Sequence, residues 1–129
     1  MKSRILLLIF LTLLMPTGLV ADGLSDSHFP YGLLELRGSP MEMRENGMFR
    51  IYSGSTTYVE GTFSIEDNKM TVHDRGGMYA CRGKRMNPGS YHWGVRDQHL
   101  YLVLIKDNCG ARRTAFLEAP LKIISATAK

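Results

Sequence analysis

Histidine, cysteine and methionine are the residue types in this chain that could bind a metal ion or react. His73, His92 and His99 fall in or beside predicted strands, and imidazole nitrogen suits zinc or copper. The histidines form no HxH or HxxxH pair, which favours surface positions over a three-histidine site. No Ser-His-acid, Cys-His or phosphate-loop spacing is present either. The sequence nominates no nucleophile, and we expect a protein with neither enzymatic activity nor a cofactor.

The methionines offer a second metal chemistry. Met41 and Met43 precede the pair Asn46-Gly47 and Met48 follows it, so a hairpin turn there would bring the thioethers close together. Soft sulfur ligands select Cu(I). Methionines also fill irregular gaps in protein cores, and that interpretation is favoured over a copper site.

Cys81 and Cys109 are the two cysteines of the chain. In an exported protein they are expected to form a disulfide, because the oxidising compartment removes the reason to keep thiols free. Closing residues 81–109 into a loop would stabilise the fold by about 3.6 kcal/mol in the chain-entropy model. Metal-binding thiols are the alternative, which the absence of a CxxC pair disfavours.

Aromatic residues provide the candidate ligand site. In a barrel, Phe63, Tyr91 and Trp93 would share the interior face, where they either line a cavity or fill the core. We expect Arg112 to close the barrel end over Trp93 through a cation–ring contact, worth about 0.5–2 kcal/mol. That role for Arg112 is structural.

The N-terminus predicts export. Lys2 and Arg4 precede an apolar run, and residues 1–21 have the layout of a secretory signal peptide cleaved after Ala21. Cleavage leaves 108 of the 129 residues, enough for one small domain, and lowers the net charge from +4 to +2. Nucleic acid is therefore not an expected partner. No later apolar run is long enough for a membrane-spanning helix.

The elements that must position these residues are short strands. Residues 22–40, interrupted by glycine and proline, are expected to form an irregular lead-in segment. The pair Asn46-Gly47 predicts a hairpin with a type I′ turn. Gly61, inside the predicted strand 58–65, indicates a bulge or bend. Residues 113–118 are expected to form a further strand, and no segment has a helical period.

The count is about eight strands within residues 41–124, mostly in sequential hairpins, followed by a tail at 125–129. We therefore predict an all-β fold, a small antiparallel meander β-barrel, because closure removes exposed strand edges. The strand Leu100 to Ile105 is apolar on both faces. It therefore needs cover on both, from the lead-in segment, a neighbouring subunit or the chain end.

Two hairpins of the chain echo each other, the first over residues 61–72 and the second over residues 89–102. Cys81 stands before the second hairpin and the motif Asp107-x-Cys109-x-x-Arg112 behind it. With this arrangement the chain resembles the small exported lipocalin-like β-barrels of bacteria, within the calycin group. The resemblance covers about residues 41–124. It implies a closed or nearly closed antiparallel barrel that binds small apolar molecules in its interior.

Three functional hypotheses follow. The first is a secreted or periplasmic protein that binds a small, mostly apolar molecule lined by Phe63, Tyr91 and Trp93. The second is an interaction module with a filled core, which contacts another copy or a protein partner through the strand Leu100 to Ile105. The third is a periplasmic Cu(I) carrier that uses the clustered methionines.

Overall fold

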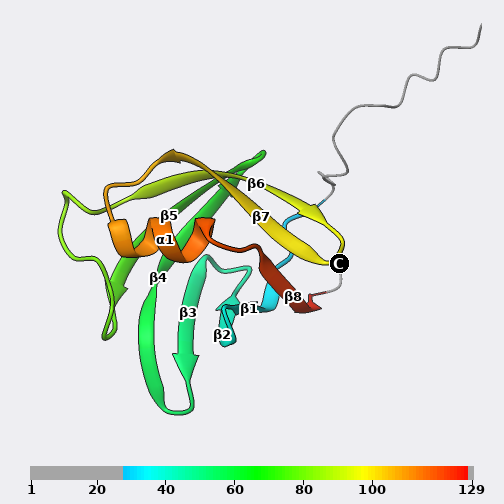
Figure 1. The fold of residues 1–129 in the computed structure, drawn as a ribbon, viewed down its shortest axis with the longest axis horizontal. Helices are drawn as coiled ribbons and strands as arrows, with labels where there is room; N and C mark the ends of the chain where they lie inside the picture. Colours follow the sequence, from blue (N-terminus) through cyan, green and yellow to red (C-terminus); the bar gives the residue numbers. More distant parts are fainter. Residues whose placement is uncertain (1–27, 128–129) are drawn as a thin grey trace, which may run out of the picture.

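The structure is a computed structural model that describes residues 28–127. Eight antiparallel strands follow one another around a closed barrel, which the pairing of the first strand with the last completes (Figure 1). The strands are β1 (Gly32–Leu36), β2 (Ser39–Met43), β3 (Met48–Ser53), β4 (Thr56–Glu66), β5 (Lys69–Gly76), β6 (Gly89–Arg96), β7 (His99–Lys106) and β8 (Leu121–Ala126). The predicted antiparallel meander barrel is confirmed. The predicted signal peptide, residues 1–21, lies outside the described residues.

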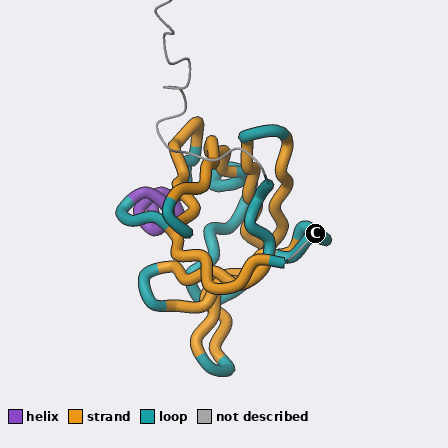
Figure 2. Tube along the Cα trace, turned by 90° about the vertical axis from the view of Figure 1, so that its right-hand side faces the viewer, coloured by secondary structure: helices purple, strands orange, loops and turns teal. Residues whose placement is uncertain are grey.

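One helix, α1 (Gly110–Leu117), connects β7 to β8 within the described part of the chain. Figure 2 shows the strands arranged around a ring, with α1 at its flank. In residues 28–127 no helix is long and apolar enough to cross a membrane.

The core follows from the period-two alternation of side chains along each strand. On β5, for example, Met70 and Val72 are buried while Lys69 and His73 are exposed. The inward positions of all eight strands are mainly apolar, and they form one buried cluster that includes Leu34, Met41, Met43, Phe49, Phe63, Tyr91, Trp93, Leu100 and Leu121. The interior is therefore packed with side chains over most of its length.

The barrel begins earlier than the sequence indicated. β1 lies within the segment predicted to be an irregular lead-in, and it pairs with both β2 and β8. Leu34 and Leu36 bury their side chains at alternate positions, as a strand requires. β8 likewise extends into the predicted tail, as far as Ala126. The first strand was hidden because Gly32 begins it, Gly38 lies in its turn and Pro40 lies in its partner strand β2.

The hairpin turns also differ from the expectation at Asn46-Gly47. A type I′ turn needs positive φ at both central residues. Arg37-Gly38 (φ 52° and 87°) and Asp97-Gln98 (φ 49° and 61°) meet that condition. At Asn46-Gly47 only the glycine has a positive φ, 86°, and the connection spans the four residues 44–47. The hairpin predicted there exists, but its turn type was wrong.

The predicted strand at 113–118 was also wrong, because these residues continue helix α1. Cys109 is the N-cap, and its Sγ accepts a hydrogen bond from the main-chain N–H of Arg112 at 3.3 Å. Arg112 and Phe116, four residues apart, are the buried residues of the helix. Good helix formers occupy most of its positions, and Pro120 follows its end. Phe116 is the only buried apolar residue of this eight-residue helix, so the sequence contains no apolar repeat that would reveal a helical period.

Gly61 lies at a close approach between β4 and β5. The strand register shifts between Glu60 and Gly61, which confirms the predicted bulge. A Cβ atom at this position would stand 2.0 Å from the main-chain oxygen of His73 and 2.9 Å from Cε1 of Phe49. No side chain larger than hydrogen fits there.

We expect Gly61→Ala to lower the free energy of unfolding by about 1–3 kcal/mol, because the backbone of β5 must move away. Gly110→Ala is the matched control. Its Cβ would meet no atom closer than 3.8 Å and it starts α1, so its effect should stay within about 1 kcal/mol and favour stability. Urea unfolding curves of both variants check this, and equal midpoints would contradict the close approach at Gly61.

Candidate functional site

Arg112 is the centre of a buried polar cluster at the end of the barrel where β5 stops and β6 begins. Its Nε and Nη2 donate to the two carboxylate oxygens of Asp107 at 2.7 and 2.8 Å. Its Nη1 donates to Oδ1 of Asn87 at 2.8 Å and lies 2.9 Å from Oδ1 of Asp74. All four residues are more than nine-tenths buried. The guanidinium thus joins α1 to β5, to the end of β7 and to the loop before β6 through charge-assisted hydrogen bonds.

Tyr91 extends the cluster into the core. Its hydroxyl donates a hydrogen bond to Oδ2 of Asp107, and its ring packs against Phe116 with centroids 5.3 Å apart. Burial, with the hydrogen bond to Asp107, raises the pKa of Tyr91 far above its usual value. The phenol therefore remains protonated and acts as a donor to the carboxylate.

The two charged partners keep each other ionised. Burial alone would raise the pKa of Asp107, but hydrogen bonds from Arg112, Tyr91 and the N–H of Cys109 outweigh it, and the pKa lies below its usual value. Burial likewise would lower the pKa of Arg112, yet its hydrogen bond to Asp107 and its attraction to Asp74 raise it. With two carboxylates and one guanidinium, the cluster carries a formal charge of −1.

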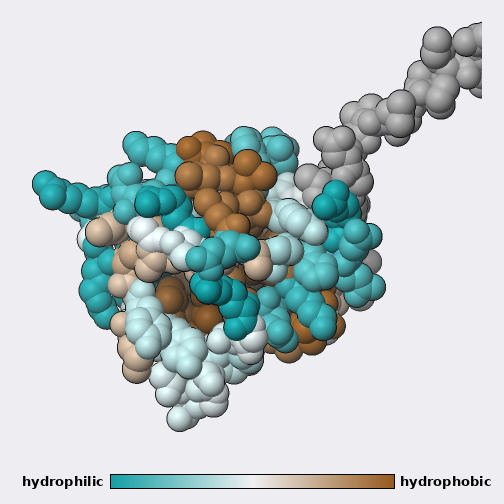
Figure 3. Space-filling view, in the orientation of Figure 1, coloured by the Kyte–Doolittle hydropathy of each residue, from teal (hydrophilic) through white to brown (hydrophobic). Residues whose placement is uncertain are grey.

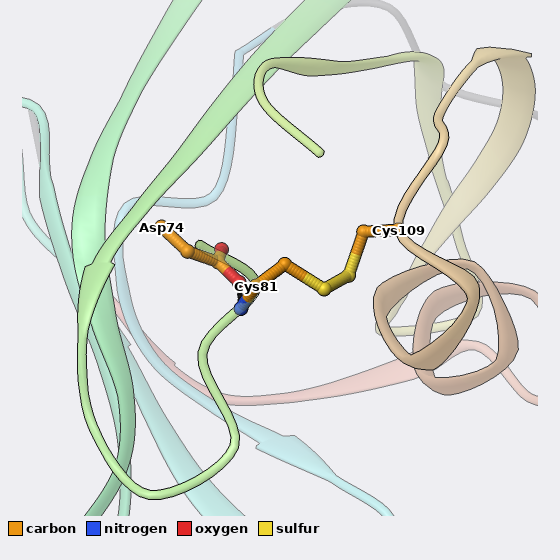
Figure 4. A group of neighbouring side chains, drawn as sticks. All are labelled: Asp74, Cys81 and Cys109. Atoms are coloured by element: carbon orange, nitrogen blue, oxygen red, sulfur yellow. Dashed lines mark hydrogen bonds between the residues drawn. A yellow bond between two sulfur atoms is a disulfide. The ribbon is translucent and has the colours of Figure 1, made fainter. Parts of the chain in front are cut away.

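Cys81 and Cys109 form a disulfide, which confirms their predicted pairing. The disulfide lies beside Asp74 (Figure 4). It joins the loop after β5 to the N-cap of α1, with a Cα–Cα distance of 6.0 Å. The main-chain N–H of Cys81 donates to Oδ2 of Asp74 at 2.9 Å. The two sulfurs and this carboxylate are close enough to share a metal ion, but sulfurs bonded to each other are not thiolate ligands. The group is therefore a structural junction.

A pocket of about 230 Å³ opens next to the cluster, between α1 and strands β3 and β4. In Figure 3 it is the hollow with hydrophobic residues at its base, below the position of α1 in Figure 1. Its lining is Leu36, Arg37, Ser39, Phe49, Ile51, Tyr58, Val59, Asp74, Tyr79, Ala111, Arg112, Ala115 and Phe116. The lining is mainly apolar, and Asp74 and Arg112 are its buried charged members.

Oδ1 of Asp74 is the distinctive atom of this lining. It is buried and receives no hydrogen bond, although Nη1 of Arg112 lies 2.9 Å from it without the alignment of one. Buried polar atoms are otherwise almost always hydrogen-bonded in folded proteins. Here the ion pair with Arg112 compensates the buried charge of Asp74, and Oδ1 itself has almost no accessible surface.

The structure places the three residues predicted to line a ligand site elsewhere. Phe63 and Trp93 lie against Phe29, with ring centroids 5.7 and 5.3 Å away. Tyr91 is at the opposite end, in the polar cluster. All three are buried, but none lines the pocket beside α1.

Arg112 does not close the barrel over Trp93 as expected. The indole N–H of Trp93 donates to the main-chain oxygen of Asp67 at 3.0 Å, at the β4–β5 turn. The interactions of Arg112 are with Asp74, Asn87 and Asp107 at the other end. The expected contact was wrong because Arg112 lies on a helix that turns its side chain toward the carboxylates.

The predicted metal ligands are not gathered. Met41 and Met43 are buried in the core, whereas Met48 is 52% exposed on the outer face of β3. His73 and His92 are exposed as well, and neither belongs to a group of potential ligands in the described part of the chain. Within residues 28–127, the three methionines do not all face one site, and the histidines do not form a metal-binding group.

The strand Leu100 to Ile105 was predicted to need cover on both faces, but within residues 28–127 its second half is exposed. Val103, Leu104 and Ile105 have exposed fractions of 58, 40 and 43%. Figure 3 shows a hydrophobic patch in the region of β6 and β7. β8 pairs with β7 only at His99 and Leu100, so it does not extend along this part of the strand. An interaction through the patch stays a prediction.

Comparison of the chain with protein-family models, curated proteins and solved structures found no match. The closed antiparallel barrel is thus the level at which the resemblance from the sequence is confirmed. Any function must be argued from the site itself.

We expect Arg112→Met to lower the free energy of unfolding by about 3–5 kcal/mol, because it leaves two buried carboxylates without their cation. Arg37→Met is the matched control. Arg37 pairs with Glu118 at 2.7 Å on the surface, where both side chains are half exposed, so its loss should cost less than about 1 kcal/mol. Denaturant unfolding measures both, and similar small losses would show that the cluster is not a stabilising junction.

The stability should also depend on the ionisation of Asp107. Its folded-state pKa lies below the ordinary value of 3.8, so its stabilising effect is complete above that pH and is lost as the pH falls through the folded-state pKa. Asp107→Asn removes this titration. Between about pH 4 and pH 2, the unfolding free energy of the native chain should therefore fall more steeply than that of the variant. Parallel curves in urea titrations would contradict the lowered pKa.

Proposed function

We propose that this protein is an exported, lipocalin-like binding protein for a small, mostly apolar molecule, and that the molecule occupies the pocket between α1, β3 and β4. The observation that carries the proposal is the pocket's composition. Phe49, Ile51, Val59 and Phe116 supply apolar walls, and the same lining includes two buried charged residues, Asp74 and Arg112. This combination is typical of small-molecule sites.

The size of the pocket supports a small ligand. An apolar protein cavity of about 150 Å³ is enough to hold benzene. At about 230 Å³ the pocket can hold a molecule somewhat larger than one aromatic ring. The proposal therefore moves the ligand away from Phe63 and Trp93, whose rings pack against Phe29.

The walls of the pocket are held rigidly, which favours binding. α1 is anchored at its start by the Cys81–Cys109 disulfide and along its inner face by Arg112. A pre-formed site loses little conformational entropy when it binds. The disulfide also agrees with export to an oxidising compartment, either the periplasm or the exterior.

The proposal can be tested by adding toluene, a probe of suitable size, to the protein and recording its methyl NMR spectrum. Toluene should shift the methyl signals of Ile51 and Val59 and leave the indole N–H of Trp93 unchanged. Ala115→Leu should weaken the binding at least about tenfold, because it places three more carbons in the pocket. Thr114→Leu adds a leucine to the exposed side of the same helix and should leave binding intact.

Two results would contradict the proposed site. One is a toluene affinity that Ala115→Leu does not change. The other is a set of shifts centred on Trp93 and Phe63, which would return the ligand to the aromatic end of the barrel. Native mass spectra of the protein from its producing cells would then identify the molecule that copurifies.

A further inference from the structure

The second half of β7 carries an apolar surface that the described residues leave open. Val103, Leu104 and Ile105, here called the β7 patch, are all exposed. By the alternation of a strand, Val103 and Ile105 lie on one face and Leu104 on the other, so both faces of this strand end are accessible. Exposed apolar side chains that adjoin one another are typical of a binding surface.

Exposed cations lie beside the patch, where β7 ends. Lys106 follows Ile105 directly and pairs with Ser90 at the start of β6. Nδ2 of Asn108 donates to the main-chain oxygen of Arg85 at 3.0 Å, which holds the loop before β6 next to the end of β7. Lys84, in the same loop, is exposed, as are Arg85 and Lys106. None of these three cations forms an ion pair within residues 28–127.

The acidic residues of this part of the chain do not balance the three cations. Between residues 68 and 117 the acids are Asp74, Asp97 and Asp107. Asp74 and Asp107 are buried and form ion pairs with Arg112. Asp97 lies in the β6–β7 turn, at the other end of β7. The end of β7 therefore joins exposed apolar side chains to positive charge that no exposed acid in this part of the chain offsets.

We propose that the β7 patch, together with Lys84, Arg85 and Lys106, binds the protein to the surface of a membrane that contains anionic lipids. The cations contact the lipid phosphates, and the patch enters the boundary between the head groups and the acyl chains. This inference goes beyond the proposed function, because the patch does not belong to the lining of the pocket beside α1.

A lipid surface fits this arrangement better than a protein does. It offers negative charge and hydrocarbon side by side, so it satisfies the cations and covers the patch together. The buried cores of protein interfaces are enriched in aromatic residues and arginine, whereas the patch is entirely aliphatic. A second copy of the chain, seated on the same patch, would bring like charges together at its rim.

Vesicle co-sedimentation tests the proposal on the protein purified from its producing cells. Two compositions are compared: phosphatidylcholine alone, and phosphatidylcholine in which about one third of the lipid is replaced by phosphatidylglycerol. We expect the protein to bind the mixed vesicles at least about tenfold more tightly at low salt, because only these attract the cations. Salt at about 0.5 M should remove most of this preference by screening the charges.

Ile105→Glu places a charge in the patch and should weaken binding to the mixed vesicles at least about tenfold. Ile124→Glu is the matched control, because both isoleucines are similarly exposed, at 43 and 46%, and Ile124 lies on β8 beyond the pairs that join it to β7. All variants keep the same N-terminus, so differences between them come from the barrel.

Lys84→Glu tests the electrostatic part and should also weaken binding to the mixed vesicles at least about tenfold. Lys69→Glu is its control, since it changes the net charge by the same amount at the start of β5, at the opposite end of the barrel. Its effect should stay within about threefold, because charges farther away than the Debye length are largely screened.

Three results would overturn the membrane surface. One is equal binding to both vesicle types, or binding to neither. Another is an Ile105→Glu variant that binds as well as Ile124→Glu, which would leave the cations acting alone, as they would on any polyanion. The third is a dimer in sedimentation velocity that Ile105→Glu dissociates, which would assign the patch to a second copy. None of these results changes the test of the pocket with toluene.

Discussion

The ion pair between Arg112 and Asp107 is the interaction on which the arrangement of this barrel end depends. Three parts of the chain far apart in sequence meet there: β5 through Asp74, the loop before β6 through Asn87, and the β7–α1 junction through Asp107. Each of these partners is buried, so each would be costly without the guanidinium. The covalent link between Cys81 and Cys109 holds the same parts together. The protein thus fixes one end of its barrel with charge and covalent bonds and the other with aromatic packing.

The difference between the two barrel ends explains why the pocket beside α1 lies at the polar end. At the aromatic end, the ring of Phe29 packs against those of Phe63 and Trp93, with centroids 5.7 and 5.3 Å away. At the polar end, helix α1 connects β7 to β8. Its buried side chains, Arg112 and Phe116, pack against the barrel. A helix does not follow the twist of neighbouring strands, so its contact with β3 and β4 is incomplete. The pocket is the space left between these surfaces.

The sequence predicted the architecture well because alternation and turn residues are local signals. β2 and β3 were located by the turn pair between them, β4 and β6 by alternating apolar residues, and β7 by its continuous apolar run. The bulge at Gly61 was indicated by a glycine inside a strand. The number of strands was right partly because two differences offset each other. β1 was missed within residues 22–40, and the residues of α1 were counted as a strand. Cys109 before a run of helix formers, with Pro120 behind, was a signal for the helix that a search for long periods overlooks.

The candidate site was less predictable, since it is assembled by the tertiary fold. Nothing in the spacing of Asp74, Asn87 and Asp107 indicates that one arginine binds all three. The spacing of Asp107, Cys109 and Arg112 did carry information, because an N-cap places the side chain three residues later back over the preceding turn. The aromatic residues were correctly expected to be buried. Their register around the barrel decides whether they face a cavity, and register depends on strands that the sequence pattern did not reveal.

The limited pairing between β7 and β8 has a consequence for local opening. Two residue pairs join these strands, at His99 and Leu100, whereas the pairing of β6 with β7 extends over most of both strands. The free energy of separating neighbouring strands is therefore lowest at this seam. Amide hydrogen exchange should be fastest there among the strand pairs, and a separation at the seam would release the C-terminal end of α1 while the disulfide held its start. The ring is closed all the way round, but the seam where α1 enters the wall is held by fewer strand pairs than the hairpins on either side.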